Sequence, residues 1–253
     1  MIPPEPGTLD LSAVVPVHNE RDSLETLVDE LRSALDATRQ SWEIVLVDDA
    51  SSDGSTERIR DAAGRDARVR AVMLARWAGQ SAAIVAGLER AGGRVIVTLD
   101  ADLQNDPADL PKLLAALEHA DVVSGIRAMR RDRASRRMAS SVANAVRRAV
   151  LGDTVTDIGC SFKAYRREAL AGLPGFVGVH RFLPALCQLR GARLAEVVVG
   201  HRERRYGTSK YGVTNRLWRG VHDLAGVHWL KSRLLPPQAR DEEVATPPAE
   251  RTP

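Results

Sequence analysis

VTLDADLQNDP, residues 97–107, begins as an apolar run and ends in a cluster of acids and amides. The cluster contains Asp100, Asp102, Gln104 and Asp106. A continuous apolar run is typical of a strand that is buried on both faces of a parallel sheet. Ligands of open α/β sheets bind beyond the carboxyl ends of the strands. The acids are therefore predicted to lie on a ligand-binding rim and not in the core.

Apolar strands and amphipathic helices alternate on both sides of this stretch. Strands are predicted at residues 11–17, 42–47, 69–74, 95–99 and 121–124. Helices are predicted after an Asp22 or Ser23 cap, after the turn at 51–54, at 80–90 with Gly92-Gly93 closing the helix, and from Pro107 to Leu117. This alternation predicts an α/β fold, Rossmann-like, with a mostly parallel sheet flanked by helices and right-handed crossovers.

Charge is distributed unevenly along the 253 residues, although the net charge is only +3. Residues 1–125 carry 12 Lys/Arg against 22 Asp/Glu, whereas residues 126–253 carry 24 against 11. Such asymmetry favours anionic ligands or a membrane surface. Two cysteines, Cys160 and Cys187, define no disulfide framework, which favours a reducing compartment.

The two ends of the chain differ from the rest in composition. Residues 1–8 and 236–253 are rich in proline and charge and are predicted to be disordered. No signal peptide is recognised, and no run of ~18 apolar residues is present to cross a bilayer. We therefore expect a cytoplasmic protein, with peripheral contact to the inner face of the cell membrane left open.

A last amphipathic helix is predicted over residues 213–235. Its apolar face would be formed by Leu217, Trp218, Val221, Leu224, Ala225 and His228. Tryptophan beside Lys and Arg suits a membrane interface. The same stripe also fits packing on the protein's own core, so the pattern leaves both interpretations open.

The common phosphate-binding loops are missing. Neither G-x-G-x-x-G after the first strand nor G-x-x-x-x-G-K-[ST] occurs, which disfavours a dinucleotide oxidoreductase and a P-loop enzyme. Asp100 and Asp102 instead offer two carboxylates at a strand end, and Mg²⁺ typically takes one or two carboxylates plus substrate phosphates. An isolated D-x-D also fits solvated loop acids. Asp106 before Pro107 is predicted to be a helix N-cap.

Six segments in fixed order carry a more specific signal. They are VVPVHNE, IVLVDDASSDGS, GQSAAIVAGLERAGGRVIVTLDADLQNDP, SGIR, DIGCSFKAYRREAL and RRYGTSKYG. Together they resemble family 2 of the inverting glycosyltransferases, which has a GT-A-type fold. Within it they resemble the dolichyl- or polyprenyl-phosphate sugar synthase branch, which includes dolichol-phosphate mannosyltransferases. The resemblance covers residues 9–235 and implies a catalytic domain over 9–212, followed by the helix at 213–235.

The resemblance implies a donor site for a nucleoside-diphosphate sugar with Mg²⁺ or Mn²⁺. The metal residues would be Asp100, Asp102 and Gln104, with Asp102 the essential ligand. The nucleotide-sugar residues would be Pro16, His18, Glu20, Val47, Asp48, Asp49, Asp100, Ala101, Arg204 and Lys210.

The resemblance also implies an acceptor site. Arg127, Arg136 and Ser161 would serve an acceptor phosphate, and Asp102, Asp157 and Arg127 would be catalytic. Asp157 would act as a base or orient the acceptor, although a turn cap is also compatible with its position. A phosphomonoester is already anionic near neutral pH, since its second pKa is ~6, so no obligatory base is predicted. His180 and His201 are interpreted as structural.

The implied reaction transfers a sugar from GDP-mannose or a UDP-hexose to a polyprenyl phosphate. Inversion would give a β-linked polyprenyl-phosphate sugar. Transfer to a soluble or natural-product acceptor is an alternative, because many relatives carry C-terminal membrane spans that this sequence lacks. A degenerate nucleotide-sugar binding module is the non-enzymatic alternative. We expect no nucleic-acid partner, and the pattern predicts no oligomeric state.

Overall fold

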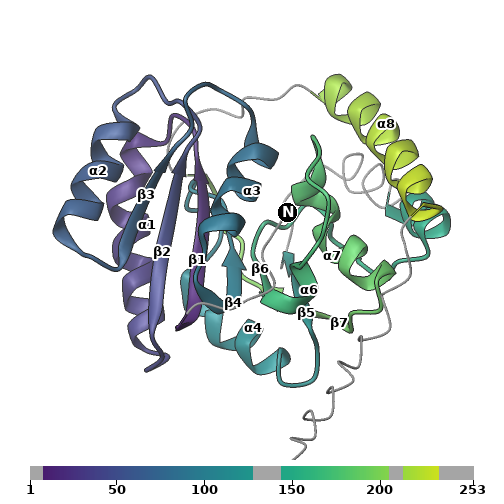
Figure 1. Cartoon of the computed structure of the whole chain (residues 1–253), viewed down its shortest axis with the longest axis horizontal. Helices are drawn as coiled ribbons and strands as arrows, with labels where there is room; N and C mark the ends of the chain where they lie inside the picture. The colour runs from purple at the N-terminus through teal and green to yellow at the C-terminus, as the bar shows by residue number, and fades with distance from the viewer. Residues whose placement is uncertain (1–7, 128–143, 205–212, 234–253) are drawn as a thin grey trace, which may run out of the picture.

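A seven-stranded sheet forms the centre of the computed structural model, which describes residues 8–127, 144–204 and 213–233 (Figure 1). The strands are β1 (Leu9–Val17), β2 (Trp42–Asp48), β3 (Val69–Met73), β4 (Gly93–Thr98), β5 (Val122–Arg127), β6 (Lys163–Arg166) and β7 (Leu194–Val199). The helices are α1 (Arg21–Asp36), α2 (Ser55–Arg65), α3 (Gln80–Arg90), the 3₁₀ turn η1 (Pro107–Asp109), α4 (Leu110–Ala116), α6 (Arg167–Leu170), α7 (Val179–Leu189) and α8 (Val213–Lys231). Residues 144–151 are also helical.

The strand order is β3-β2-β1-β4-β6-β5-β7, and only β6 runs against its neighbours. The predicted mostly parallel α/β sheet is thus confirmed, but β6 and β7 were not predicted. Because β6 is antiparallel, it begins where β4 ends, with Lys163 opposite Thr98. This reversal places the segment before β6 beside the acids that follow β4.

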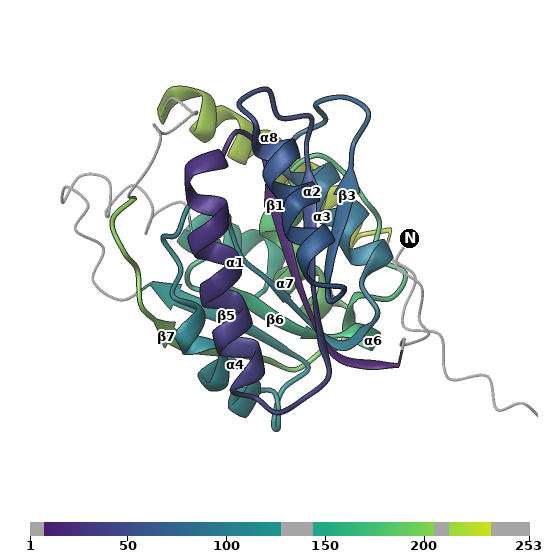
Figure 2. The same cartoon turned by 90° about the vertical axis from the view of Figure 1, so that its left-hand side faces the viewer.

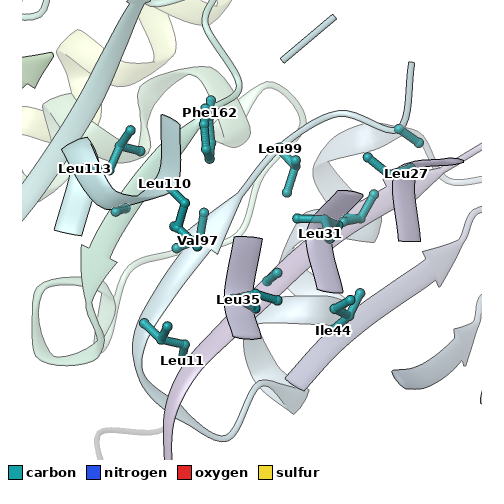
Figure 3. Close-up of a cluster of buried hydrophobic side chains, with 14 of the residues drawn as sticks. Leu11, Leu27, Leu31, Leu35, Ile44, Val97, Leu99, Leu110, Leu113 and Phe162 are labelled. Carbon is teal, nitrogen blue, oxygen red and sulfur yellow. The ribbon is translucent and has the colours of Figure 1, made fainter. Parts of the chain in front are cut away.

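Two apolar layers enclose the sheet. On one face, Leu27, Leu31 and Leu35 of α1 pack over Ile44 and neighbouring strand residues (Figure 3). Helix α1 lies across this face, with α4 beside it (Figure 2). Helices α3, α7 and α8 contribute the buried residues of the other face. Apolar strand residues are thus covered on both sides, as a largely parallel sheet requires.

Two predicted helix caps were wrong. Helix α1 begins at Arg21 with Glu20 as its N-cap, and Ser23 Oγ donates to the carbonyl of Glu20 instead of capping the helix. Helix α3 ends at Arg90, as predicted, but its C-cap Ala91 is extended, so no glycine closes it. The predicted cap before Pro107 is confirmed, since the Asp106 carboxylate accepts from the Ala108 N–H at 3.0 Å.

Gly93 does not close helix α3, but close packing against β1 requires a glycine at this position. A Cβ at this position would lie 2.6 Å from both Leu11 C and Ser12 N of β1. We expect Gly93→Ala to lower the free energy of unfolding by at least about 1–3 kcal/mol, because backbone atoms have to move. Gly64→Ala is the matched control, since nothing lies within 4 Å of its Cβ position in α2. That control is expected to gain about 0.5–1 kcal/mol from helix propensity. Urea unfolding of both variants measures the difference, and equal stabilities would contradict the expectation.

Helix α8 packs on the protein itself along its described part. Val227 is 1% exposed, and Leu224 and Leu230 pack beside it against the core. Lys231 Nζ donates to the Leu151 carbonyl at 2.7 Å, and Asp223 pairs with Arg181 at 3.6 Å.

The predicted apolar face of this helix was partly wrong. Ala225 and His228 are exposed, and Val227 takes the buried position instead. The side chains of Leu217, Trp218 and Val221 lie outside the described residues, as do residues 1–7 and the predicted tail. None of the helices described is both long and apolar enough to span a bilayer.

Candidate functional site

Most predicted donor residues lie at the ends of β1 and β2 or in the three loops that follow β1, β2 and β4 at one edge of the sheet. Each loop turns through a non-glycine residue with positive φ: Asn19 at 53°, Ala50 at 51° and Leu103 at 60°. Such conformations cost free energy and persist only where the surroundings enforce them. Sharp turns at the strand ends direct the flanking polar residues along the rim.

The two acids at the end of β2, Asp48 and Asp49, are buried and hold neighbouring loops. Asp48 Oδ1 accepts from the Ser51 N–H at 3.1 Å, and its Oδ2 accepts from Thr56. Asp49 accepts from the backbone N–H groups of residues 78 and 79 at 2.7 and 2.8 Å. Asp48 and Asp49 are only 3% and 2% exposed, so their carboxylates hold the loops of the rim in place from the protein interior.

The other predicted donor residues in β1 and β2 and the loops after them differ in how far their side chains are exposed to solvent. Val47 is fully buried beneath α3, so its side chain is not presented on the rim. Pro16 and His18 are partly exposed, and His18 Nδ1 lies 2.8 Å from the Asp49 carbonyl oxygen. His18 therefore lies directly beside the Asp49 loop.

Side chains from three segments that are far apart in the sequence come together at this rim. Arg204 Nη2 donates to Asp102 Oδ2 at 2.6 Å, and Arg204 Nη1 lies 3.5 Å from Glu20 Oε1. All three were predicted to serve the donor. The fold places the cation of residue 204 on the acids that follow β1 and β4.

Asp100 is held from a neighbouring helix. Gln80 Nε2, at the start of α3, donates to Asp100 Oδ1 at 2.7 Å. Burial raises the pKa of Asp100 to about 6, and the charge of Asp102 adds to this effect. A hydrogen bond from Ser161 and the charges of Lys163 and Arg204 act in the opposite direction. Two close acids in this environment favour a bound cation.

These residues fit a divalent cation that is shared with a ligand. In the described part of the chain no group of three or more His, Cys, Asp or Glu side chains forms a metal site. Mg²⁺ needs no such cage, because it commonly binds one or two carboxylates together with substrate phosphates. The guanidinium of Arg204 on Asp102 shows that this acid already attracts a cation. Ala101 is buried in the core between the acids, and Gln104 joins the network through its backbone N–H to Asp102 Oδ1.

The predicted acceptor residues form a second group beside the acids. Arg127 and Asp157 make a two-pronged ion pair, with both N–O distances at 2.8 Å. Ser161 Oγ accepts from Asn105 at 2.8 Å, and the Ser161 carbonyl accepts from Thr98 at 2.9 Å. Reversal of β6 therefore joins the acceptor loop to the loop that carries Asp102.

Ion pairing changes the interpretation of Asp157. A carboxylate that accepts both arms of a guanidinium is held in one orientation by two charge-assisted hydrogen bonds. The geometry supports the interpretation that Asp157 orients Arg127.

Asp157→Ala is expected to destabilise the protein by about 3 kcal/mol, since it removes the carboxylate that accepts two hydrogen bonds from the largely buried Arg127 guanidinium. The side chains of the pair are only 16% and 10% exposed. Thermal or urea unfolding of Asp157→Ala, Arg127→Ala and the double variant measures the coupling. The double variant should lose less than the sum of the single variants. Strict additivity would contradict the pairing.

Several residues of the site were missed by the sequence interpretation. Gln80 and Asn105 lie in segments that carry the resemblance, but nothing in their spacing indicated that they contact Asp100 and Ser161. Lys163 is 2% exposed and donates to the His180 carbonyl at 3.3 Å. Burial lowers the pKa of Lys163 to about 8. A lysine in an unpredicted strand gave no signal that it would be buried.

The segment leading to residue 204 is anchored at its base. Arg202 pairs with Glu30 of α1 at 2.7 Å and with Asp106 at 2.7 Å. Its backbone N–H donates to the Gln104 carbonyl, and His201 forms a β-bridge with Asn105. This anchoring explains why Arg204 is delivered to Asp102 and supports a structural role for His201.

Two predicted site residues, Arg136 and Lys210, lie outside the described residues. In the described part of the basic half of the chain, residues 126–253, Arg147 is 4% exposed and bonds to Asp153 and the Val155 carbonyl. His180 Nδ1 lies 2.7 Å from Ser81 Oγ, and burial lowers the pKa of His180 to about 3. Both residues therefore have structural partners. The two cysteines are free and buried, and burial raises the pKa of Cys160 to about 11.

Comparison with known proteins agrees with this geometry. The profile described as "Glycosyl transferase family 2" matches residues 12–173. The chain belongs to glycosyltransferase family 2, and the predicted resemblance is confirmed.

Two curated relatives share the name undecaprenyl-phosphate 4-deoxy-4-formamido-L-arabinose transferase. The protein of Aeromonas hydrophila is 42% identical over 205 residues, which cover 80% of this chain and 63% of the relative. The protein of Yersinia pestis is 40% identical over 216 residues, which cover 85% of this chain and 66% of the relative. The chain thus spans slightly less than two thirds of the length of these relatives.

Solved structures confirm the GT-A-type fold. Glucosyl-3-phosphoglycerate synthase from Mycobacterium tuberculosis, in complex with Mg²⁺ and UDP, aligns with a TM-score of 0.66 at 21% identity. The alignment covers 90% of this chain and 81% of that enzyme. The same enzyme with Mn²⁺, UDP-glucose and phosphoglyceric acid gives a TM-score of 0.65 at 20% identity.

Proposed function

We propose that this protein is an inverting glycosyltransferase that transfers a sugar from a nucleoside-diphosphate sugar to a polyprenyl phosphate. The observation that carries the proposal is the contact of Arg204 with Asp102 and Glu20. It places one fixed cation and two acids on the rim where the predicted donor diphosphate would lie. The names of the relatives support the choice of a polyprenyl phosphate as acceptor.

In the proposed reaction a phosphate oxygen of the acceptor attacks the anomeric carbon in line with the leaving group. The bond between that carbon and the diphosphate oxygen breaks, and the nucleoside diphosphate departs with the electron pair. Asp100 and Asp102 would hold Mg²⁺ or Mn²⁺, which would neutralise charge on the departing diphosphate. Arg204 would bind the same diphosphate oxygens with its planar fork.

The acceptor half would hold the nucleophile in place. Arg127, fixed by Asp157, offers a guanidinium to the acceptor phosphate. The phosphate is already anionic near neutral pH, so the step requires orientation more than deprotonation. Ser161 connects this loop to the loop carrying Asp102 through its hydrogen bond with Asn105. This connection would hold the donor and acceptor sites in a fixed relative position.

A donor and acceptor panel tests the proposal. UDP-glucose, UDP-GlcNAc, GDP-mannose and UDP-4-deoxy-4-formamido-L-arabinose are each incubated with a short polyprenyl phosphate and Mg²⁺ or Mn²⁺. We expect one donor to give a lipid-linked sugar of inverted configuration, detected by mass spectrometry and NMR. Transfer only to water-soluble acceptors would replace the lipid proposal with the soluble-acceptor alternative. Donor binding without turnover on any acceptor would favour the binding-module alternative.

We also propose peripheral contact with a membrane surface, as the lipid acceptor requires. Trp229 on the outer side of α8 is 62% exposed, and Arg233 lies over its ring at 5.9 Å. Such a pair suits an interface with anionic lipid. Sedimentation with anionic vesicles at low and high salt, alongside turnover, checks this contact. A protein that stays in the supernatant at low salt while using a soluble acceptor would contradict it.

A further inference from the structure

Trp77 is an exposed aromatic residue on the rim. It lies between β3 and α3 and is 61% exposed, whereas Trp42 is 4% exposed. Among the tryptophans whose side chains are described, only Trp229 is comparably exposed. A large apolar ring in such a position calls for a functional explanation.

The loop bearing Trp77 is fixed from below by a buried acid. The Asp49 carboxylate accepts from the N–H groups of Ala78 at 2.7 Å and Gly79 at 2.8 Å. Gly79 has a φ of 86°, a value that favours glycine, and it forms the N-cap of α3. Charge-assisted hydrogen bonds of this kind are stronger than neutral ones. The indole is therefore presented by an ordered turn.

The backbone carbonyl of Asp49 also contacts a second ring, that of His18. His18 Nδ1 lies 2.8 Å from the Asp49 carbonyl oxygen. The rings of His18 and Trp77 have centroids 6.4 Å apart and planes inclined by 50°. The two rings form a wedge at the ends of β1 and β3.

The order of the strands aligns this wedge with the acids. Along the sheet the order is β3, β2, β1, β4, so the Trp77 loop and Asp102 follow strands that are three spacings apart, about 14 Å. An extended nucleoside diphosphate can span such a distance, with its base at one end and its diphosphate at the other.

We propose that the Trp77 indole is the stacking platform for the base of the donor nucleotide, with His18 at the edge of that base. Aromatic faces stack on any nucleobase, because every base has a π-face. Asp49 acts as a positioning residue, since its carboxylate is spent on the loop and is only 2% exposed. The proposal rests on the proposed function, which supplies a nucleoside-diphosphate donor.

Calorimetric titration of the full chain with UDP, GDP and inorganic pyrophosphate, each with Mg²⁺, tests the platform. Trp77→Ala is expected to weaken UDP or GDP binding about 5- to 150-fold, the range found when a stacking aromatic is removed. Pyrophosphate has no base, so its Kd should be unchanged. Trp77→Phe should fall between wild type and Trp77→Ala. Trp229→Ala is the matched control and should leave all three Kd values at the wild-type level.

A double variant tests the role of Asp49. Asp49→Asn should weaken nucleotide binding in the wild-type background but add little in the Trp77→Ala background, because both changes act through the indole. Independent, additive effects would overturn the positioning role.

The remaining outcomes separate this proposal from the proposed function. Nucleotide binding in wild type that is unchanged in Trp77→Ala would overturn the stacking platform alone. An equal loss of pyrophosphate binding in Trp77→Ala would also overturn it, since the effect would not concern the base. If wild type binds neither nucleotide, the nucleoside-diphosphate donor and the platform are both overturned.

Discussion

Asp102→Asn is expected to lower kcat/KM by on the order of 10²–10³-fold, the range seen when one charge-stabilising group is removed from an active site. Asp102 is 7% exposed and lies 2.6 Å from Arg204. The substitution preserves shape and removes the charge that a divalent cation and Arg204 would share. Steady-state kinetics at saturating Mg²⁺ measures the loss, and circular dichroism checks that the fold is kept.

Asp121→Asn is the matched control for this variant. Asp121 also pairs with an arginine, Arg193, at 3.0 Å, but it precedes β5 at the opposite edge of the sheet. Its substitution should leave kcat/KM unchanged. If wild-type protein turns over at a comparable rate in saturating EDTA, the metal assignment to Asp102 is refuted.

Arg204→Ala should produce a loss of similar size, on the order of 10²–10³-fold in kcat/KM. The guanidinium would stabilise the charge that develops on the departing diphosphate, and alanine supplies neither charge nor hydrogen bonds. Arg204→Lys keeps the charge without the planar fork and should recover only part of the activity.

The control for Arg204 is Arg193→Ala, which removes the partner of Asp121. Kinetics of the three variants, with the donor varied at fixed acceptor, separates binding from chemistry. Unchanged kcat/KM in Arg204→Ala would place residue 204 away from the diphosphate and would remove the main support for the donor site.

Local patterns predicted the first half of the fold well. Strands β1 to β5 and helices α1, α3 and α4 have a clear apolar period, and the acids after β1, β2 and β4 reach one rim as the parallel topology requires. Neighbouring parallel strands and their ends follow from short-range information.

The second half could not be predicted in the same way. Strand β6 has only four residues, and its pairing with β4 depends on contacts between distant parts of the chain. Two charged residues in it or directly after it, Lys163 and Arg167, are 2% and 1% exposed. Sequence patterns place such residues on the surface, because burying a charge is costly unless partners are present. The partners here include carbonyl groups of His180 and Gly93, which only the folded chain brings near.

The roles of individual site residues were likewise predictable from the sequence only in part. Membership of Asp102, Glu20 and Arg204 in one cluster agrees with the resemblance. Asp49 was predicted to contact the nucleoside, yet its carboxylate faces two backbone donors of a neighbouring loop. A sequence indicates which acids follow a strand. The direction of each carboxylate depends on the conformation of loops, and loops show no apolar periodicity from which that conformation could be predicted.

The contact between Arg204 and Asp102 has a consequence for the end of the catalytic cycle. On the proposed function, the nucleoside diphosphate and Asp102 are alternative partners of one guanidinium. When the product leaves, the acid can take up the arginine at once, at a distance of 2.6 Å. Departure is then an exchange of partners and does not expose an unpaired cation, so the barrier to product release is lowered. The same exchange reduces the net affinity for the donor, which favours rapid turnover over tight retention.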